Sequence, residues 1–194
     1  TRAKPSALVV ADMPFGSYQQ SMAQAVRNAV RFVREGGADA VKLEGGESQA
    51  NKIRAIVEAG IPVMAHLGLL PQSVLREGGY RVQGKTSEQI KRLEKDLLAV
   101  ERAGAFSCVL EYVRSRVAKR LTKRSSIPTI GIGAGAGCDG QVLVTSDLLG
   151  LQAWLEPKAA RRYAHLGPVM RNAFERFSKD VRSGGFPGRK ESFE

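Results

Sequence analysis

The sequence predicts an α/β fold with a parallel sheet, of the (β/α)8 barrel type. Short apolar runs rich in β-branched residues alternate with longer stretches that have helical periodicity. Continuous apolar runs too short for helices are typical of parallel strands that are covered on both faces. Glycines follow several of the helical stretches, and a repeated order of helix, glycine and strand is typical of α/β proteins.

The elements can be placed along the chain by these patterns. The expected strands are Ala7–Asp12, Ala40–Glu44, Pro62–Leu67, Phe106–Tyr112, Pro128–Gly133 and Gln141–Thr145. The expected helices are Met22–Glu35, Gln49–Ala59, Ser87–Ala103 and Arg114–Lys123. Gly36, Gly37, Gly60 and Gly104 follow three of the helices, where a helix C-cap favours positive φ.

These elements make about six βα units, whereas a complete barrel has eight and typically about 250 residues. We therefore expect a barrel whose N-terminal strands are missing from the chain. An open doubly wound sheet is the alternative architecture. No Gly-x-Gly-x-x-Gly turn follows the first expected strand to favour its dinucleotide-binding version.

Length and composition indicate one globular domain over residues 1–194. The chain is 43% hydrophobic and 25% charged, which is close to the average for soluble proteins. It has no apolar run of the roughly 20 residues that span a bilayer, and no secretory signal, so we expect a cytoplasmic protein with no membrane contact. Cys108 and Cys138 are too few for a disulfide framework and lack zinc-ligand spacing.

The net charge of +11 is high for an enzyme that acts on small molecules. Much of the excess lies between Arg114 and Arg124, a stretch without an acidic residue. At helical spacing several of these side chains would form one basic stripe. Such a stripe could contact nucleic acid, an anionic membrane or an acidic partner. A solvated helix face is favoured instead, because no aromatic residues interleave with the charges as stacking platforms.

Five ionisable side chains lie at or near the ends of four successive expected strands: Asp12, Lys42, Glu44, His66 and Glu111. Barrel enzymes place their catalytic groups at these carboxyl ends. Residues two apart on a strand point to the same face, so Lys42 and Glu44 should project together. This convergence predicts an active site.

Each residue also has a structural explanation. Asp12 could cap the following helix. Lys42 and Glu44 could form an ion pair that lines the core. His66 could be a core histidine with satisfied hydrogen bonds, and Glu111 could be an exposed carboxylate at a strand end.

As a set, the residues suit one kind of chemistry. Asp12 and Glu44 offer hard oxygen ligands for Mg²⁺, which needs only one or two protein carboxylates beside its substrate. Lys42 could neutralise a substrate carboxylate or a developing enolate, and His66 could donate a hydrogen bond. Glu111, if partly buried, could be the general base at a carbon next to a carbonyl. The glycine-rich segment 131–137 lets the backbone approach a ligand closely, or is a flexible turn.

Six motifs then carry a family resemblance over nearly the whole chain. They are Val9–Tyr18 (VVADMPFGSY), Ala40–Glu47 (AVKLEGGE), Pro62–Val74 (PVMAHLGLLPQSV), Gly78–Lys85 (GGYRVQGK), Pro128–Val144 (PTIGIGAGAGCDGQVLV) and Gly184–Phe193 (GGFPGRKESF). In order and spacing they resemble the motif series of the ketopantoate hydroxymethyltransferase (3-methyl-2-oxobutanoate hydroxymethyltransferase) family.

The resemblance implies a function and residue roles. Asp12 and Glu44 match the family's magnesium ligands, Asp12, Lys42 and His66 match its substrate contacts, and Glu111 matches its general base. The implied reaction transfers a hydroxymethyl group from the cosubstrate methylene-tetrahydrofolate to 3-methyl-2-oxobutanoate. It gives ketopantoate for pantothenate biosynthesis through a Mg²⁺-stabilised enolate. The family also implies a homo-oligomer, a decamer, in the bacterial cytoplasm or the eukaryotic mitochondrial matrix.

Three features depart from the family pattern. The family's Gly-Asp-Ser motif, which supplies another metal ligand, lies on an earlier strand that the chain lacks. Ser146 and Glu191 stand where family members often carry other residues. Two alternative functions stay open: a related Mg²⁺-enolate barrel enzyme of the phosphoenolpyruvate mutase or isocitrate lyase type, and a non-catalytic barrel fragment that is a structural or nucleic-acid-associated subunit.

Overall fold

The computed structural model describes residues 6–77, 79–152 and 159–193. The chain divides into two compact units, Thr1–Val142 and Leu143–Glu194. The first unit contains the sheet, and the second contains the helical segments that follow residue 143. A single domain over residues 1–194 therefore stays a prediction.

The first unit is built on one parallel sheet. Its strands are β1 (Val10–Asp12), β2 (Ala40–Glu44), β3 (Val63–Gly68), β4 (Ser107–Glu111), β5 (Thr129–Ile132) and β6 (Gly140–Gln141). Within the described residues they form a six-stranded sheet in the order β1-β2-β3-β4-β5-β6, with every neighbouring pair parallel. This sequential order is that of half a barrel. The α/β class is confirmed, and the complete eight-stranded barrel stays a prediction.

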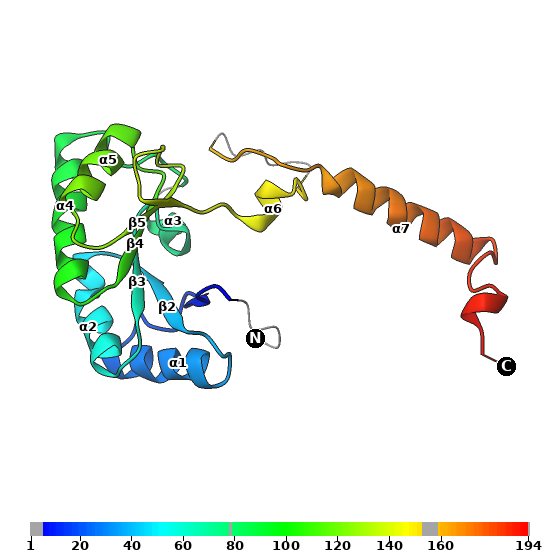
Figure 1. The fold of residues 1–194 in the computed structure, drawn as a ribbon, viewed down its shortest axis with the longest axis horizontal. Helices are drawn as coiled ribbons and strands as arrows, with labels where there is room; N and C mark the ends of the chain where they lie inside the picture. The colour runs from blue at the N-terminus through cyan, green and yellow to red at the C-terminus, as the bar shows by residue number, and fades with distance from the viewer. Residues whose placement is uncertain (1–5, 78, 153–158, 194) are drawn as a thin grey trace. The chain divides into compact units, whose positions relative to one another are not determined.

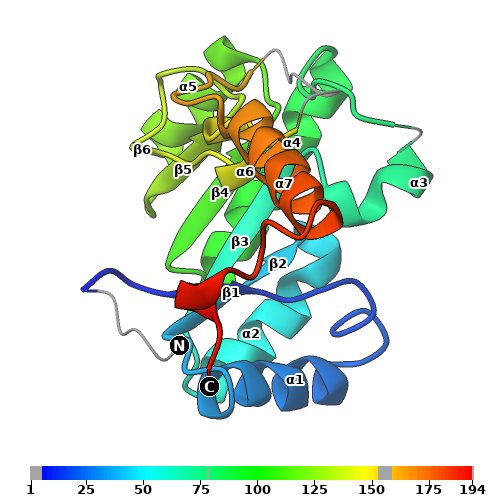
Figure 2. The same cartoon turned by 90° about the vertical axis from the view of Figure 1, so that its right-hand side faces the viewer.

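Helices cover one face of this sheet. They are α1 (Met22–Arg34), α2 (Ala50–Glu58), α4 (Ser87–Arg102) and α5 (Ser115–Arg124), and they lie on one side of the strands in Figure 1. The turned view in Figure 2 shows α2 and α4 behind the strands and α1 below them. Short elements follow two strands: the 3-10 helix η1 (Glu47–Gln49) after β2, and η2 (Pro71–Ser73) with α3 (Val74–Glu77) after β3.

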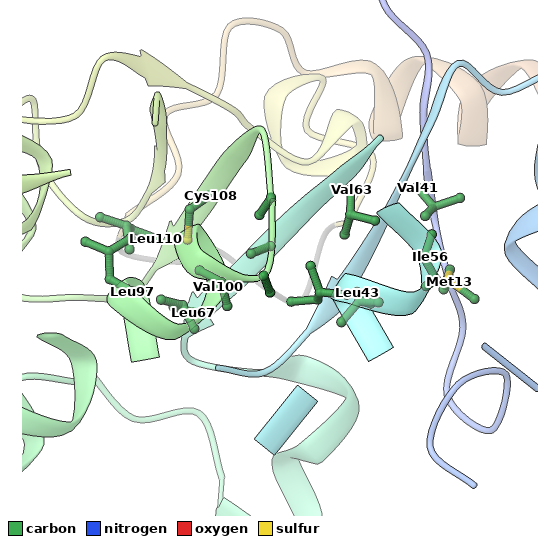
Figure 3. Close-up of a cluster of buried hydrophobic side chains, with 14 of the residues drawn as sticks. Met13, Val41, Leu43, Ile56, Val63, Leu67, Leu97, Val100, Cys108 and Leu110 are labelled. Carbon is green, nitrogen blue, oxygen red and sulfur yellow. The ribbon is translucent and has the colours of Figure 1, made fainter. Parts of the chain in front are cut away.

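The core lies between the sheet and these helices. Val41, Leu43, Val63, Cys108 and Leu110 are completely buried and belong to one hydrophobic cluster. Ile56 of α2 and Leu97 and Val100 of α4 belong to the same cluster, as Figure 3 shows. Because side chains alternate along a strand, the residues between these apolar positions point to the opposite face. This alternation places charged residues such as Lys42 on the open face of the sheet.

Local signals explain where the helices begin and end. The Ser21 side chain accepts a hydrogen bond from Gln24 N at 3.1 Å and caps α1, and Thr86 caps α4 in the same way through Gln89 N. Gly37, Gly60 and Gly104 have positive φ, as the sequence predicts for helix ends. Gly36 has no positive φ, because the left-handed position falls on the next residue.

At the C-terminal side, one predicted strand is wrong and two helical segments were not predicted. The predicted strand Gln141–Thr145 is wrong: β6 ends at Gln141, and Thr145 begins α6 (Thr145–Leu148). Within the part of the chain that the structure describes, β6 pairs with β5 alone, and Val142 and Val144 are about half exposed. The helix α7 (Leu166–Arg182) and the 3-10 helix η3 (Arg189–Glu191) were not predicted. Among the described residues, no helix is both long and apolar enough to cross a membrane.

Candidate active site

The parallel register brings the five candidate residues to one edge of the sheet. Asp12 of β1 is in register with Lys42 of β2, and Glu44 is in register with His66 of β3. Glu111 ends β4 beside Gly68, the last residue of β3. The structure thus brings the five side chains together at one edge of the sheet, as the sequence predicted.

Lys42 links two of the strands. Its Nζ lies 2.8 Å from Asp12 Oδ1, and the Asp12 side chain is 54% exposed. The same Nζ lies 3.1 Å from His66 Nδ1. The structural explanation of a Lys42–Glu44 ion pair is therefore replaced by a Lys42–Asp12 pair. Asp12 does not cap the first helix either, since Ser21 does.

His66 is the most buried ionisable side chain of the set, at 3% exposure. The Lys42 ammonium has only donors, so Nδ1 accepts and the ring proton lies on Nε2. Nε2 lies 3.1 Å from Glu111 Oε2 but finds no hydrogen-bond partner of acceptable geometry. A hydrogen bond is directional, so this short separation by itself does not make one. His66 is thus not a core histidine with satisfied hydrogen bonds, and its Nε2–H is free to donate to a ligand.

Glu44 is a buried carboxylate. Its Oε2 accepts a hydrogen bond from Gln72 N at 3.0 Å, and its Oε1 lies 4.0 Å from His66 Nδ1. Burial raises the pKa of Glu44, while the Gln72 N–H and the charge of Lys42 oppose that rise. A carboxylate held in a poorly solvated place is stabilised in its charged form by a bound cation.

The Glu111 side chain is 14% exposed, so the structural explanation of a solvated strand-end carboxylate is not met. Its backbone is held closely: Leu69 N donates to Glu111 O at 2.8 Å. The next residue, Tyr112, has a φ of 49°, which is uncommon for a residue with a side chain. Partial burial beside His66 suits a general base whose proton must be transferred and not lost to bulk water.

A cavity of about 500 Å³ adjoins this edge of the sheet. Of the five candidate residues, Glu44 lines this cavity, whereas Asp12, Lys42, His66 and Glu111 are not in its lining. The other lining residues include Tyr18, Gln72, Leu67, Gly46 and Asp96. Glu44 is therefore reachable by a small molecule although its side chain is buried. A concave site with a few polar groups is the usual form of a small-molecule site.

The donor atoms of the site fit a hard cation only in part. Asp12 and Glu44 supply carboxylate oxygens from neighbouring strands, which is the ligand chemistry that Mg²⁺ prefers. Among the described residues, no group of three or more His, Cys, Asp or Glu side chains forms a ready-made metal cage. Two carboxylates suffice for Mg²⁺ when water and substrate provide the other ligands.

The glycine-rich segment 131–137 has a structural use. A Cβ on Gly135 would lie 2.5 Å from Ser115 Cβ, and one on Gly137 would lie 2.7 Å from Lys119 Cβ. Both neighbours belong to α5. The glycines therefore let the turn after β5 pack against this helix.

The basic stripe of α5 is partly paired. Arg120 and Arg124 each lie 2.9 Å from Glu94 Oε1 of α4. On its other face, α5 buries Val117, Ala118 and Leu121. These contacts favour the solvated outer face of a helix, as the sequence indicated.

Two contributors to the site were not singled out from the sequence. Tyr18 is 1% exposed, and its hydroxyl contacts both Glu44 and Gln72. Gln72 donates its main-chain N–H to Glu44. Neither residue type signals chemistry by itself, although both lie inside motifs that carry the family resemblance.

Ser146 and Glu191, which depart from the family pattern, lie in the second unit. Glu191 Oε2 accepts a hydrogen bond from Gly188 N at 2.9 Å, which is a local contact.

Comparison with known proteins decides the family. Residues 1–189 match the family described as ketopantoate hydroxymethyltransferase. The chain belongs to this family. A relative named 3-methyl-2-oxobutanoate hydroxymethyltransferase, from Pelobacter propionicus, is 55% identical over 99% of the chain and 71% of its own length. Another of that name, from Enterococcus faecalis, is 53% identical over all of the chain and 70% of its own length. The family and the enzyme class predicted from the motifs are confirmed.

A solved structure supports the fold. A suspected phosphonomutase from Burkholderia cenocepacia aligns with 92% of the chain and 72% of its own chain, at a TM-score of 0.53. The sequence identity is 16%, so the likeness concerns the fold alone. It supports an α/β fold with a parallel sheet and gives no information on substrate.

Proposed function

We propose that this protein of the ketopantoate hydroxymethyltransferase family transfers a hydroxymethyl group from methylene-tetrahydrofolate to 3-methyl-2-oxobutanoate, giving ketopantoate. The observation that carries the proposal is the continuous contact from Asp12 through Lys42 and His66 to Glu111 on a half-barrel edge. The names of the relatives support the acceptor and the transferred group.

Glu111 is the proposed general base. Its carboxylate would take the proton from the branched carbon of the keto acid, leaving the electron pair as an enolate. This carbon would form a bond to the methylene carbon of the folate while the bond from the methylene carbon to one folate nitrogen breaks. A water oxygen would then replace the second folate nitrogen on the methylene carbon and become the hydroxyl group. The proton taken by Glu111 and one proton of the water would pass to the two folate nitrogens, which balances the overall reaction.

Lys42 and His66 would bind and orient the keto acid. Lys42 carries a positive charge that can neutralise the substrate carboxylate or the developing enolate. The Nε2–H of His66, which lacks a good acceptor, can donate to a substrate oxygen. His66 lies beside Glu111, and Lys42 contacts His66, so a substrate held by these two groups would present its carbon to the base.

Asp12 and Glu44 would hold Mg²⁺ together with the substrate, and Asp12 would also contact the keto acid. A bound Mg²⁺ supplies positive charge that stabilises negative charge developing on a carbonyl oxygen. The raised pKa of the buried Glu44 is consistent with a site that is completed by a cation.

Further properties are proposed with this function. We place the protein in the cytoplasm as a homo-oligomer, a decamer by the family resemblance, without membrane or nucleic-acid partners. The pairing of Arg120 and Arg124 with Glu94 supports the expectation that nucleic acid is not a partner.

Product analysis tests the proposal. The full-length protein, incubated with 3-methyl-2-oxobutanoate, methylene-tetrahydrofolate and Mg²⁺, should form ketopantoate detectable by mass spectrometry. Omitting the folate should stop product formation, since it donates the carbon. A full-length, folded protein that forms no ketopantoate would contradict the proposal and favour the non-catalytic alternative.

A further inference from the structure

Gln72 carries no charge, yet it contacts three segments of the site from the 3-10 helix η2. Its main-chain N donates to Glu44 Oε2 at 3.0 Å. Its side-chain Nε2 donates to Met13 O at 2.9 Å, and its Oε1 lies 3.0 Å from the Tyr18 hydroxyl. One residue therefore joins the ends of β1, β2 and β3.

Elementary chemistry fixes the direction of these bonds. The Met13 carbonyl can only accept, so the amide nitrogen of Gln72 must face it and the amide oxygen must face Tyr18. The Tyr18 hydroxyl must then donate. Burial raises the pKa of Tyr18 to about 12, which keeps its proton in place at neutral pH. The same hydroxyl accepts from Glu44 N at 3.2 Å, which closes a ring of three residues.

The ring acts on the two carboxylates proposed for the metal. Glu44 is held at its carboxylate by Gln72 and at its main chain by Tyr18. Asp12 is held through the next residue, Met13, which is completely buried and whose N donates to Lys42 O at 2.9 Å. Partners that fix the ligands of a metal typically change metal affinity or activity by about 10–100-fold when they are removed.

We propose that Gln72 is a positioning residue that holds Asp12 and Glu44 in fixed relative positions for a divalent cation. This inference rests on the proposed function, because it assumes that these two carboxylates bind the metal. It predicts that the Gln72 side chain changes cation affinity although it touches neither carboxylate directly.

A purely structural role must be distinguished from positioning. Gln24 of α1 offers a matched control, because its side-chain amide, like that of Gln72, bonds to the loop between β1 and α1. Its Nε2 donates to Gly16 O at 2.9 Å, and its Oε1 accepts from Gln20 N at 3.1 Å. Neither bond reaches a carboxylate. If Mg²⁺ affinity falls only because this loop is loosened, it should fall in both Gln72→Met and Gln24→Met.

The test is calorimetric titration of Mg²⁺ into the full-length protein saturated with 3-methyl-2-oxobutanoate. Gln72→Met keeps the approximate length of the side chain and the main-chain N–H but removes both side-chain bonds. It should weaken Mg²⁺ binding by about 10–100-fold. Gln24→Met should remain within about twofold of the parent. Tyr18→Phe removes a single oxygen from the ring and should also weaken binding, and it replaces Gln72→Met if that variant fails to fold.

A double-mutant cycle adds a second criterion. Because Gln72 and Tyr18 belong to one ring, the combined variant should lose less affinity than the product of the two single losses. The proposal is overturned if Gln72→Met and Tyr18→Phe bind Mg²⁺ like the parent, or if Gln24→Met loses as much as they do. A parent protein that binds no Mg²⁺ would instead contradict the metal assignment in the proposed function.

Discussion

Glu44 shows, at the scale of one residue, how burial and function are connected. Its side chain is 4% exposed, and burial raises the pKa of the carboxyl group. Without a cation, ionised Glu44 therefore costs folding free energy. A bound cation reverses this preference, so the residue suits a site that is completed by its ligand.

Because the pKa of Glu44 is raised in the folded protein, the free energy of unfolding should depend on pH. The folded-state pKa of Glu44 lies above the unfolded value near 4.5, so the unfolded chain loses this proton first as pH rises. The contribution of Glu44 to stability is complete below that value and is lost as pH rises through the folded-state pKa. Glu44→Gln, which stays neutral, should be more stable than the parent at about pH 8 in the absence of Mg²⁺.

Urea denaturation with a metal chelator measures the effect. The stability gain of Glu44→Gln over the parent should shrink as pH is lowered to about 4, where the parent carboxyl is also protonated. Glu35→Gln is a suitable control, because Glu35 is exposed and lies in a surface pair with Arg31. An equal gain for Glu44→Gln at both pH values would contradict the burial argument.

At the scale of elements, Gly68 determines how β3 and β4 meet. It has a φ of 97°, and an added Cβ would overlap with the Glu111 carbonyl oxygen. The glycine allows Leu69 N to reach that oxygen at 2.8 Å. The position of the proposed base therefore depends on the absence of a side chain in the neighbouring strand.

Gly68→Ala should destabilise the protein more than Gly60→Ala. Both glycines have positive φ, so each substitution carries a backbone cost of about 1–2 kcal/mol. An added Cβ on Gly60 meets nothing within 4 Å, whereas one on Gly68 must displace the backbone at Glu111. Denaturant unfolding gives the two free energies, and turnover of both variants shows whether Glu111 has moved. Equal destabilisation with equal turnover would contradict this account of Gly68.

The sequence predicted the elements that have strong local signals. Strands β2 to β4, the four long helices of the first unit and the convergence of Asp12, Lys42, Glu44, His66 and Glu111 follow from periodicity and strand ends. The extent of β6 could not be predicted, because an apolar run alone does not reveal that Gln141 is its last paired residue. The roles of Tyr18 and Gln72 depend on hydrogen bonds between distant segments. The helix α7 could have been found, since its apolar residues recur at helical spacing.

At the scale of the whole molecule, the enzyme is assembled from consecutive βα units. Each of the strands β1 to β4 brings one or two of the candidate side chains to the same edge, and the helices behind the sheet bury its apolar face. We propose that this edge removes a proton from a 2-keto acid, with Glu111 as the base.

Deuterium exchange at the branched carbon of 3-methyl-2-oxobutanoate tests this claim most directly, because it reports proton removal without the folate. In deuterated water with Mg²⁺, the full-length parent protein should exchange this hydrogen, as followed by proton magnetic resonance. Glu111→Gln should retain the fold and slow the exchange by about 10²–10⁴-fold, the range expected for loss of a general base. Exchange in Glu111→Gln as fast as in the parent would contradict the assignment of Glu111 as the base.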